Sequence, residues 1–106
     1  MSPKMLIKQL ENRAALQLLL FLHRRGRTKL TDIDIDASQS SFYRGLTILG
    51  RMELIDEERT PPAMRYLYLT GDGEAAAKKL EEIENILEAK REREAKRDRQ
   101  AHQAQS

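Results

Sequence analysis

The sequence contains no cysteine and only two histidines, His23 beside a run of arginines and His102 near the C-terminus. The absence of cysteine excludes disulfide bonds, thiolate metal sites and catalysis by a thiol, and it is compatible with a reducing compartment. A structural zinc site needs four protein ligands, which these residues do not supply. We therefore predict no metal centre and no cofactor.

Patterns that indicate catalysis are also missing. No histidine is paired with a nucleophile, no glycine-rich loop suits a phosphate, and no two carboxylates share an apolar background. Gly71 and Gly73 form a GDG segment that is typical of a helix start. Asp32, Asp34 and Asp36 lack the glycine and the terminal glutamate of a calcium loop, so capping and turn formation explain them better. The sequence predicts a protein that is not an enzyme.

Long hydrophobic runs are absent as well. The apolar stretch at residues 14–22 is far shorter than the roughly 20 residues of a membrane span, and it lacks a signal-peptide cleavage site. We expect a soluble cytoplasmic protein.

The charge of this 106-residue chain is mild overall but unevenly placed. A formal net charge of +2 does not by itself indicate a nucleic-acid partner. Basic residues gather at 24–29 and at 90–99, and the acidic run 32–36 lies between them. The first cluster suits contacts to phosphate, but it equally suits the negative end of a helix dipole.

The most informative segment is 38–51, which the apolar spacing predicts to be a helix. Phe42, Leu46 and Leu49 recur at helical intervals and so form a packing face, with Ser38 as the N-cap. The opposite face carries side chains that hydrogen-bond to phosphates and base edges, namely Gln39, Ser40, Ser41, Tyr43, Arg44 and Thr47.

The other elements follow from caps, prolines and alternation. A helix near the N-terminus is expected from Ser2 and Pro3. It either continues through Asn12 as one helix or gives way to a second helix over 13–25 that Asn12 caps, and Gly26 ends it. A brief strand at 28–30 precedes a short helix, and strands at 54–57 and 66–69 flank a proline turn. Thr70 begins the last helix.

This order of elements resembles the winged helix-turn-helix fold of small prokaryotic, in particular archaeal, transcriptional regulators of the MarR, ArsR and PadR kind. The segment SSFYRGLTILGRMELI is similar to their recognition helix and first wing strand, and YLYLTGDGEAAAKKL to their second wing strand and last helix. The resemblance implies a mainly α fold with a small β wing and a long C-terminal helix, and double-stranded DNA as the partner.

The resemblance also implies roles for particular residues. Residues 38–51 would lie in the major groove, and Arg44 is the best candidate for reading guanine. The cations expected at phosphates or on the wing are Arg27, Lys29, Arg59 and Arg65.

The last helix predicts self-association. Its apolar positions step by four, three and four, which is a heptad seam, and the helix before Gly26 is apolar almost all round. We expect a homodimer, although the last helix packing back onto the first remains an alternative. The candidate interface residues are Leu18, Leu22, Ala76, Leu80, Ile83 and Leu87.

Four regions and three functions follow. The predicted regions are an N-terminal helical extension at 1–11, a winged-helix domain at 12–70, a dimerisation helix at 71–89 and a charged, disordered tail at 90–106. The leading function is a homodimeric, sequence-specific transcriptional regulator. An architectural chromatin-type DNA-binding protein and a winged helix that binds protein remain as alternatives.

Overall fold

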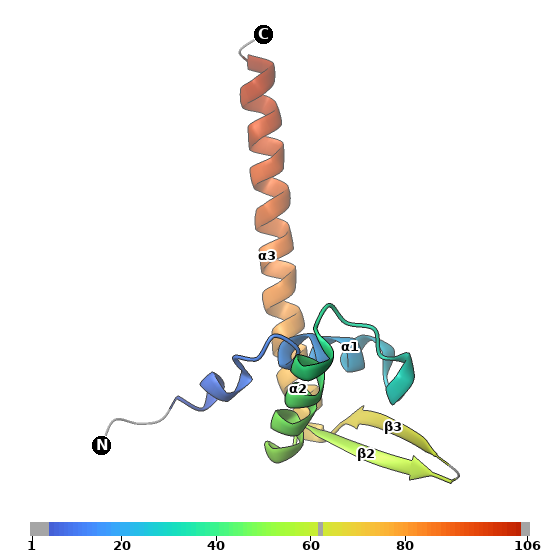
Figure 1. The fold of residues 1–106 in the computed structure, drawn as a ribbon. Coiled ribbons are helices and arrows are strands. Elements are labelled where there is room, and N and C mark those ends of the chain that lie inside the picture. The colour runs from blue at the N-terminus through green and yellow to red at the C-terminus, as the bar shows by residue number, and fades with distance from the viewer. Residues whose placement is uncertain (1–4, 62, 105–106) are drawn as a thin grey trace.

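The computed structural model describes residues 5–61 and 63–104, which form a mainly helical body with one long helix projecting from it (Figure 1). The mainly helical class with a small sheet, predicted from the sequence, is confirmed. In chain order the elements are the 3₁₀ helix Leu6–Leu10, α1 (Ala15–Arg25), β1 (Thr28–Lys29), the 3₁₀ helix Leu30–Asp32, α2 (Gln39–Arg51), β2 (Ile55–Thr60), β3 (Met64–Leu69) and α3 (Gly71–Ala104).

Helix α1 is the centre of the core. The side-chain oxygen of Asn12 accepts hydrogen bonds from the backbone N–H of Ala14 at 2.8 Å and Ala15 at 3.1 Å, and α1 ends at Gly26, whose φ of 76° suits glycine. The end at Gly26 was predicted from the sequence, whereas the helix begins at Ala15, two residues after the predicted start at Arg13.

Leu18 and Leu22 correct the predicted dimer interface. Their exposed fractions are 0% and 1%, because α2, α3 and β3 of the same chain cover α1. The all-round apolar pattern did indicate burial on several sides, but one chain supplies that cover. Neither residue is free to meet a partner.

Helix α2 crosses close to the start of α1. Ser38 caps it by accepting a hydrogen bond from the Ser41 N–H at 3.2 Å, and Leu49 is fully buried with Phe42 packed against the same core. A Cβ on Gly45 would lie 3.0 Å from the Asn12 side-chain oxygen and 3.1 Å from the Ala14 Cβ. The glycine thus permits the close approach of the two helices.

The segment between β1 and α2 is held by one side chain of α1. After the 3₁₀ turn Leu30–Asp32, the chain runs without regular structure to Ser38. Gln17 accepts a hydrogen bond from the Asp36 N–H at 2.9 Å and donates one to the Asp36 carbonyl at 3.0 Å. The short helix predicted here is a single turn.

The three strands form an antiparallel sheet in the order β1-β3-β2. In the register, Thr28 lies opposite Leu67 on one side of β3, and Ile55 opposite Leu69 on the other. Alternate side chains face opposite sides of a sheet. Leu67 and Ile55 therefore join the core, while Tyr66 and Tyr68 lie on the other face.

A compact joint connects the end of α2 to the start of α3. Glu53 has a φ of 56°, and its carbonyl accepts a hydrogen bond from the Thr70 hydroxyl at 2.7 Å. The same hydroxyl accepts from the Gly73 N–H at 3.1 Å, and the Thr70 N–H donates to the Leu54 carbonyl at 3.1 Å. A Cβ on Gly73 would come within 1.9 Å of that carbonyl.

Helix α3 is longer than the sequence predicted. The chain from Lys90 was expected to be disordered, but the helix continues to Ala104. The segment is rich in Ala, Glu, Lys and Arg, which favour helix even without an apolar face to bury, and Lys90 and Glu94 form an i,i+4 pair at 3.9 Å. Among the described residues, no helix is long and apolar enough to cross a membrane.

The N-terminal extension is only partly as predicted. Ser2 and Pro3, expected to start a helix, lie outside the described residues. The five residues Leu6–Leu10 form a 3₁₀ helix, and Met5, Leu6 and Ile7 are exposed at 70%, 67% and 64%.

Candidate nucleic-acid interface

The outer face of α2 carries most of the polar side chains that the sequence singled out. Gln39, Ser40, Tyr43, Arg44 and Thr47 are exposed, whereas Ser41 is half-buried and its hydroxyl is bonded to Ser38 at 3.1 Å. The Thr47 hydroxyl donates to the Tyr43 carbonyl at 3.0 Å, one turn back along the helix. Ser41 is therefore part of the cap, and the remaining five form the exposed face.

Two arginines of α2 are available on this face. Arg44 and Arg51 are seven residues apart, so they project from the same side of the helix, and both are exposed. Within the described residues neither has a carboxylate within 4 Å. Arg51 was not predicted from the sequence, although its spacing of seven residues from Arg44 indicates that both lie on the same side of a helix.

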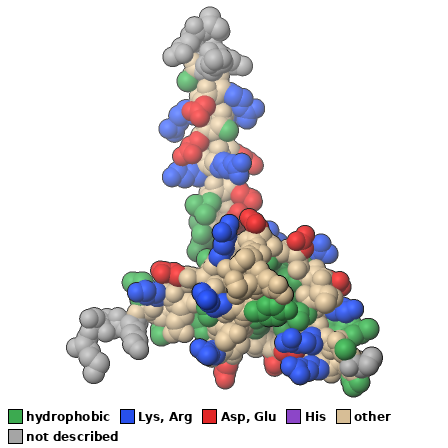
Figure 2. Space-filling view, viewed as in Figure 1, with side chains coloured by type: hydrophobic (Ala, Val, Ile, Leu, Met, Phe, Trp, Pro, Cys, Tyr) green, Lys and Arg blue, Asp and Glu red, His purple; other side chains and the backbone are tan. Residues whose placement is uncertain are grey.

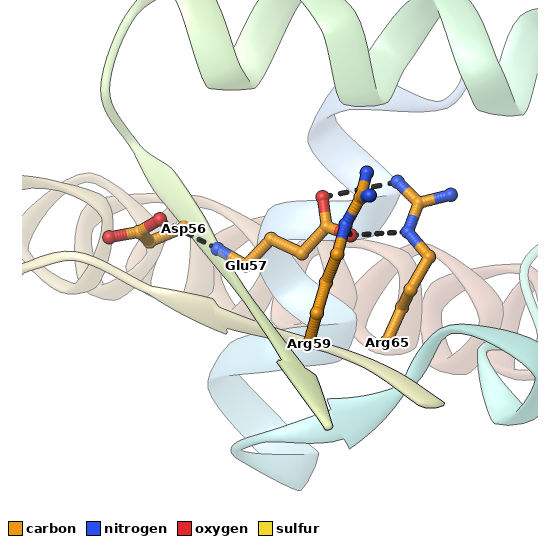
Figure 3. A network of polar contacts seen from close by, with 4 residues as sticks. All are labelled: Asp56, Glu57, Arg59 and Arg65. Carbon is orange, nitrogen blue, oxygen red and sulfur yellow. Dashed lines mark hydrogen bonds and ion pairs between the residues drawn. The ribbon is translucent and has the colours of Figure 1, made fainter. Parts of the chain in front are cut away.

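The cations of the β2–β3 hairpin are paired with acids. Figure 3 shows the Glu57 carboxylate beside the guanidinium groups of both Arg59 and Arg65. The Arg59 Nε donates to Glu57 Oε1 at 3.1 Å; Arg65 donates to both carboxylate oxygens, with Nη2 at 3.1 Å from Oε2. The Glu57 side chain is 27% exposed. One carboxylate thus faces both hairpin arginines.

These contacts shift the titration of the groups involved. The hydrogen bond from Arg65 lowers the pKa of Glu57, with a smaller contribution from Arg59, because both favour the charged carboxylate. The same bond raises the pKa of Arg65. On the body, the bidentate bond from Arg24, at 2.9 Å and 3.1 Å, lowers the pKa of Glu81 on α3.

Arg27 and Lys29 lie on the other face of the sheet. Arg27 pairs with Glu58 at 2.8 Å, and its guanidinium carbon lies 4.5 Å from the centre of the Tyr66 ring. Lys29 is opposite Tyr66 in the strand register. Since Tyr66 and Arg65 are adjacent on β3, their side chains face opposite sides. The four predicted phosphate-binding cations therefore lie two on each face of the sheet, Arg27 and Lys29 on one and Arg59 and Arg65 on the other.

A groove joins α2 to the hairpin. Its volume is about 410 Å³, and it runs between the outer face of α2 and the side of the sheet that carries Glu57 and Arg65. Tyr43 is 46% exposed here and packs edge-on against Phe42, with ring centres 5.3 Å apart. The lining residues are Tyr43, Leu46, Thr47, Gly50, Ile55, Asp56, Glu57, Arg65 and Leu67.

The predicted seam of α3 divides into two parts. Ala76 and Leu80 are half-buried, and Leu80 packs against the chain's own core. Ile83 and Leu87 are exposed at 50% and 56%, together with Ile86, which the sequence analysis did not single out, at 65%. Packing of α3 onto the chain's own core therefore accounts for Ala76 and Leu80 and leaves Ile83 and Leu87 uncovered.

The described part of the chain holds no cluster of side chains suited to a metal ion. In residues 5–61 and 63–104 no three His, Asp or Glu side chains come together as ligands. His23 Nδ1 lies 3.0 Å from a carboxylate oxygen of Glu74, which joins α1 to α3.

The fold is similar to that of a solved structure described as "Putative transcriptional regulator ytfH from Salmonella typhimurium". The two chains are 20% identical, the match covers 78% of each, and the TM-score is 0.67. At this level of identity the likeness establishes the fold. No protein-family model matches the chain, and no curated protein sequence matches it.

Proposed function

We propose that this chain is a DNA-binding transcriptional regulator with a winged helix-turn-helix fold, acting as a homodimer with α2 in the major groove. The observation that carries the proposal is the outer face of α2, where Arg44 and Arg51 project without an ion pair in the described part of the chain. The likeness of the fold to a structure named as a regulator supports the same conclusion.

The residues take distinct roles in this proposal. Arg44 and Tyr43 read base edges from the middle of α2, while Gln39 and Ser40 lie at its N-terminus, where free backbone N–H groups favour a phosphate. Arg51 contacts the backbone further along the groove. The β2–β3 hairpin is the wing, with Arg59 and Arg65 on the side that faces α2.

The pairing of the hairpin cations favours a second candidate function. Glu57 and Glu58 form ion pairs with the three arginines nearest the hairpin, so the wing offers little unpaired positive charge. A winged helix of that kind suits a protein surface as a partner. Absence of any DNA shift at low salt, together with a stable protein complex, would support this candidate over the first.

The test is selection of bound sequences from random DNA at a stated salt concentration, followed by variants on the selected site. Arg44→Ala should weaken binding to that site by about 1–3 kcal/mol and act much less on random DNA, because a bidentate contact to guanine is lost. Arg27→Ala, on the far face of the sheet, is the matched control and should change little. Equal losses on selected and random DNA would remove Arg44 as a reader of sequence.

A further inference from the structure

Three large apolar side chains stand exposed on α3 where it leaves the body. Ile83, Ile86 and Leu87 are 50%, 65% and 56% exposed, and no element of the described chain covers them. Figure 2 shows apolar side chains gathered at the base of the projecting helix, below a region of alternating charge. Contiguous exposed apolar side chains of this kind indicate an interaction site rather than an ordinary solvent-exposed surface.

The net charge of α3 changes sign across this patch. Residues 81–88 carry four glutamates and no cation, and residues 90–99 carry six cations against three acids. Acids near the N-terminus and cations near the C-terminus also complement a helix dipole, but that effect acts only within the first and last turns. It accounts for Asp72 and Glu74, and not for a change of sign in the middle of a 34-residue helix.

We infer that α3 pairs with α3 of a second copy in antiparallel orientation, centred on the step from Ile86 to Leu87. This inference rests on the homodimer of the proposed function and assigns its interface. In a parallel, in-register pair, the four glutamates of 81–88 would lie beside the same four, and the basic run beside itself. In the antiparallel pair the basic run no longer lies beside itself, because 90–99 lies beside 74–83. There Glu74 and Glu81 contact His23 and Arg24 of their own chain, and Lys79 and Glu82 are exposed.

The register brings opposite charges together along the seam. Lys79 and Glu94 lie equally far on either side of the centre and close to the side of α3 that carries Ile83, Ile86 and Leu87, so each would face the other in the partner. Within one chain, Lys79 pairs with Glu82 at 3.6 Å and Lys90 with Glu94 at 3.9 Å. All four of these side chains are more than half exposed, so the contacts are weak and exchangeable.

The body leaves this side of α3 open. Ala75, Lys79 and Glu82 are exposed, and the buried side of the helix, marked by Ala77, faces α1. The two bodies would then lie toward opposite ends of the pair. At 1.5 Å per residue, Ala77 and its copy would be about 30 Å apart along the helix axis, close to one turn of DNA.

Disulfide cross-linking can test this pairing because the chain contains no other cysteine that could react. Lys79→Cys and Glu94→Cys are prepared as single variants carrying different tags, then oxidised alone and as a mixture. Antiparallel pairing predicts a disulfide in the mixture only, because residue 79 and its copy would be about 22 Å apart, beyond the roughly 7 Å limit between Cα atoms. Glu92→Cys, on the opposite side of the helix from the seam, is the control and should not cross-link.

Each outcome is informative. Cross-linking of each single variant with itself, and not between them, would overturn the orientation in favour of a parallel pair. No cross-linking, with monomers at all concentrations in sedimentation, would overturn the pairing altogether. Binding of the monomer to a single DNA half-site would then show that the DNA-binding part of the proposed function stands without the homodimer, whereas no DNA binding at all would remove both.

A charge exchange tests the same register without cysteine. Lys79→Glu should weaken the dimer by about five- to tenfold, since two attractive pairs become repulsive, and Glu94→Lys should do the same. The double variant restores both pairs only in the antiparallel register. Failure of the double variant to recover would contradict it.

Discussion

At the scale of single residues, Glu57 controls how much charge the hairpin can offer. Its carboxylate accepts hydrogen bonds from Arg59 and Arg65, the two hairpin arginines on the side of α2. A DNA phosphate needs the same donors, so it must replace the carboxylate to use them.

Glu57→Gln should therefore strengthen DNA binding several-fold and steepen its salt dependence, by up to about 0.9 in slope for each phosphate newly contacted. The measurement is affinity at a series of salt concentrations. Glu58→Gln is the control, because it releases Arg27 on the opposite face of the hairpin. Weaker binding by Glu57→Gln would mean that the carboxylate orients Arg65 toward DNA.

The same residue makes stability depend on pH. Because hydrogen bonds lower the folded-state pKa of Glu57 and of Glu81, each contributes stability that is present above the ordinary glutamate value of 4.5. That contribution is lost as the pH falls through the lowered pKa. Thermal unfolding at fixed protein concentration should show a decrease in midpoint below about pH 4.5.

The variant Glu57→Gln should show a smaller decrease across that window, and Glu92→Gln, an exposed change on α3, should follow the parent chain. Superimposable curves for the parent and Glu57→Gln would show that the pair adds no stability.

The ion pairs of the hairpin were beyond prediction from the sequence for a physical reason. Glu57 lies opposite Leu67, and Arg65 opposite Arg59, so Glu57 and Arg65 meet diagonally across two strands. That contact depends on the register, and a turn containing two prolines does not define the register from sequence alone. Arg44, by contrast, could be predicted because helical spacing alone sets its face.

At the scale of elements, caps made the helices of the body predictable. Gly26 and Ser38 lie at the boundaries of α1 and α2 as expected, and Asn12 bonds to the backbone just before α1, which begins two residues later than predicted. The state of the chain after Lys90 was not predictable from its lack of apolar residues. Composition showed only that the segment has no core to bury, and its helix propensity favoured continuation.

The joint between α2 and α3 gives a prediction at this scale. Gly73→Ala should destabilise the chain by about 3 kcal/mol, because the added methyl group would meet the backbone carbonyl of Leu54, which cannot move aside cheaply. The measurement is chemical denaturation. Gly71→Ala is the matched control, since nothing lies within 4 Å of its Cβ position, and its stability should differ little from the parent.

If Gly73→Ala is as stable as Gly71→Ala, the backbone between α2 and α3 can shift without cost. The close approach of the Leu54 carbonyl to Gly73 would then not constrain the position of α3.

At the scale of the whole molecule, the exposed apolar side chains of α3 give a prediction about the proposed pairing. Ile86→Glu should weaken self-association on the order of 100-fold, from losing about 1.5 kcal/mol of apolar burial in each chain. The side chain is 65% exposed in the single chain, so the folded monomer should keep its helical content. Sedimentation and circular dichroism measure the two effects, with Gln100→Glu as the control on the same helix. A parent chain that is monomeric throughout would contradict this prediction.

The sequence could indicate that α1 and α3 carry more apolar surface than one helix pair needs. It could not show which of these side chains the same chain buries and which it leaves exposed. Leu18 and Leu22 turned inward because α2, α3 and β3 all meet at α1. Ile83 and Leu87 stayed exposed because α3 projects out of the body (Figure 1). Only the lengths and crossing of the helices, which arise in three dimensions, separate the two groups.

The hydrogen bonds of Thr70 leave α2 and α3 without a hinge between them. In a pair of chains joined through α3, the distance between the two copies of α2 would therefore be fixed. Such a protein would tolerate changes of base within a binding site better than the insertion of a single base pair between its halves.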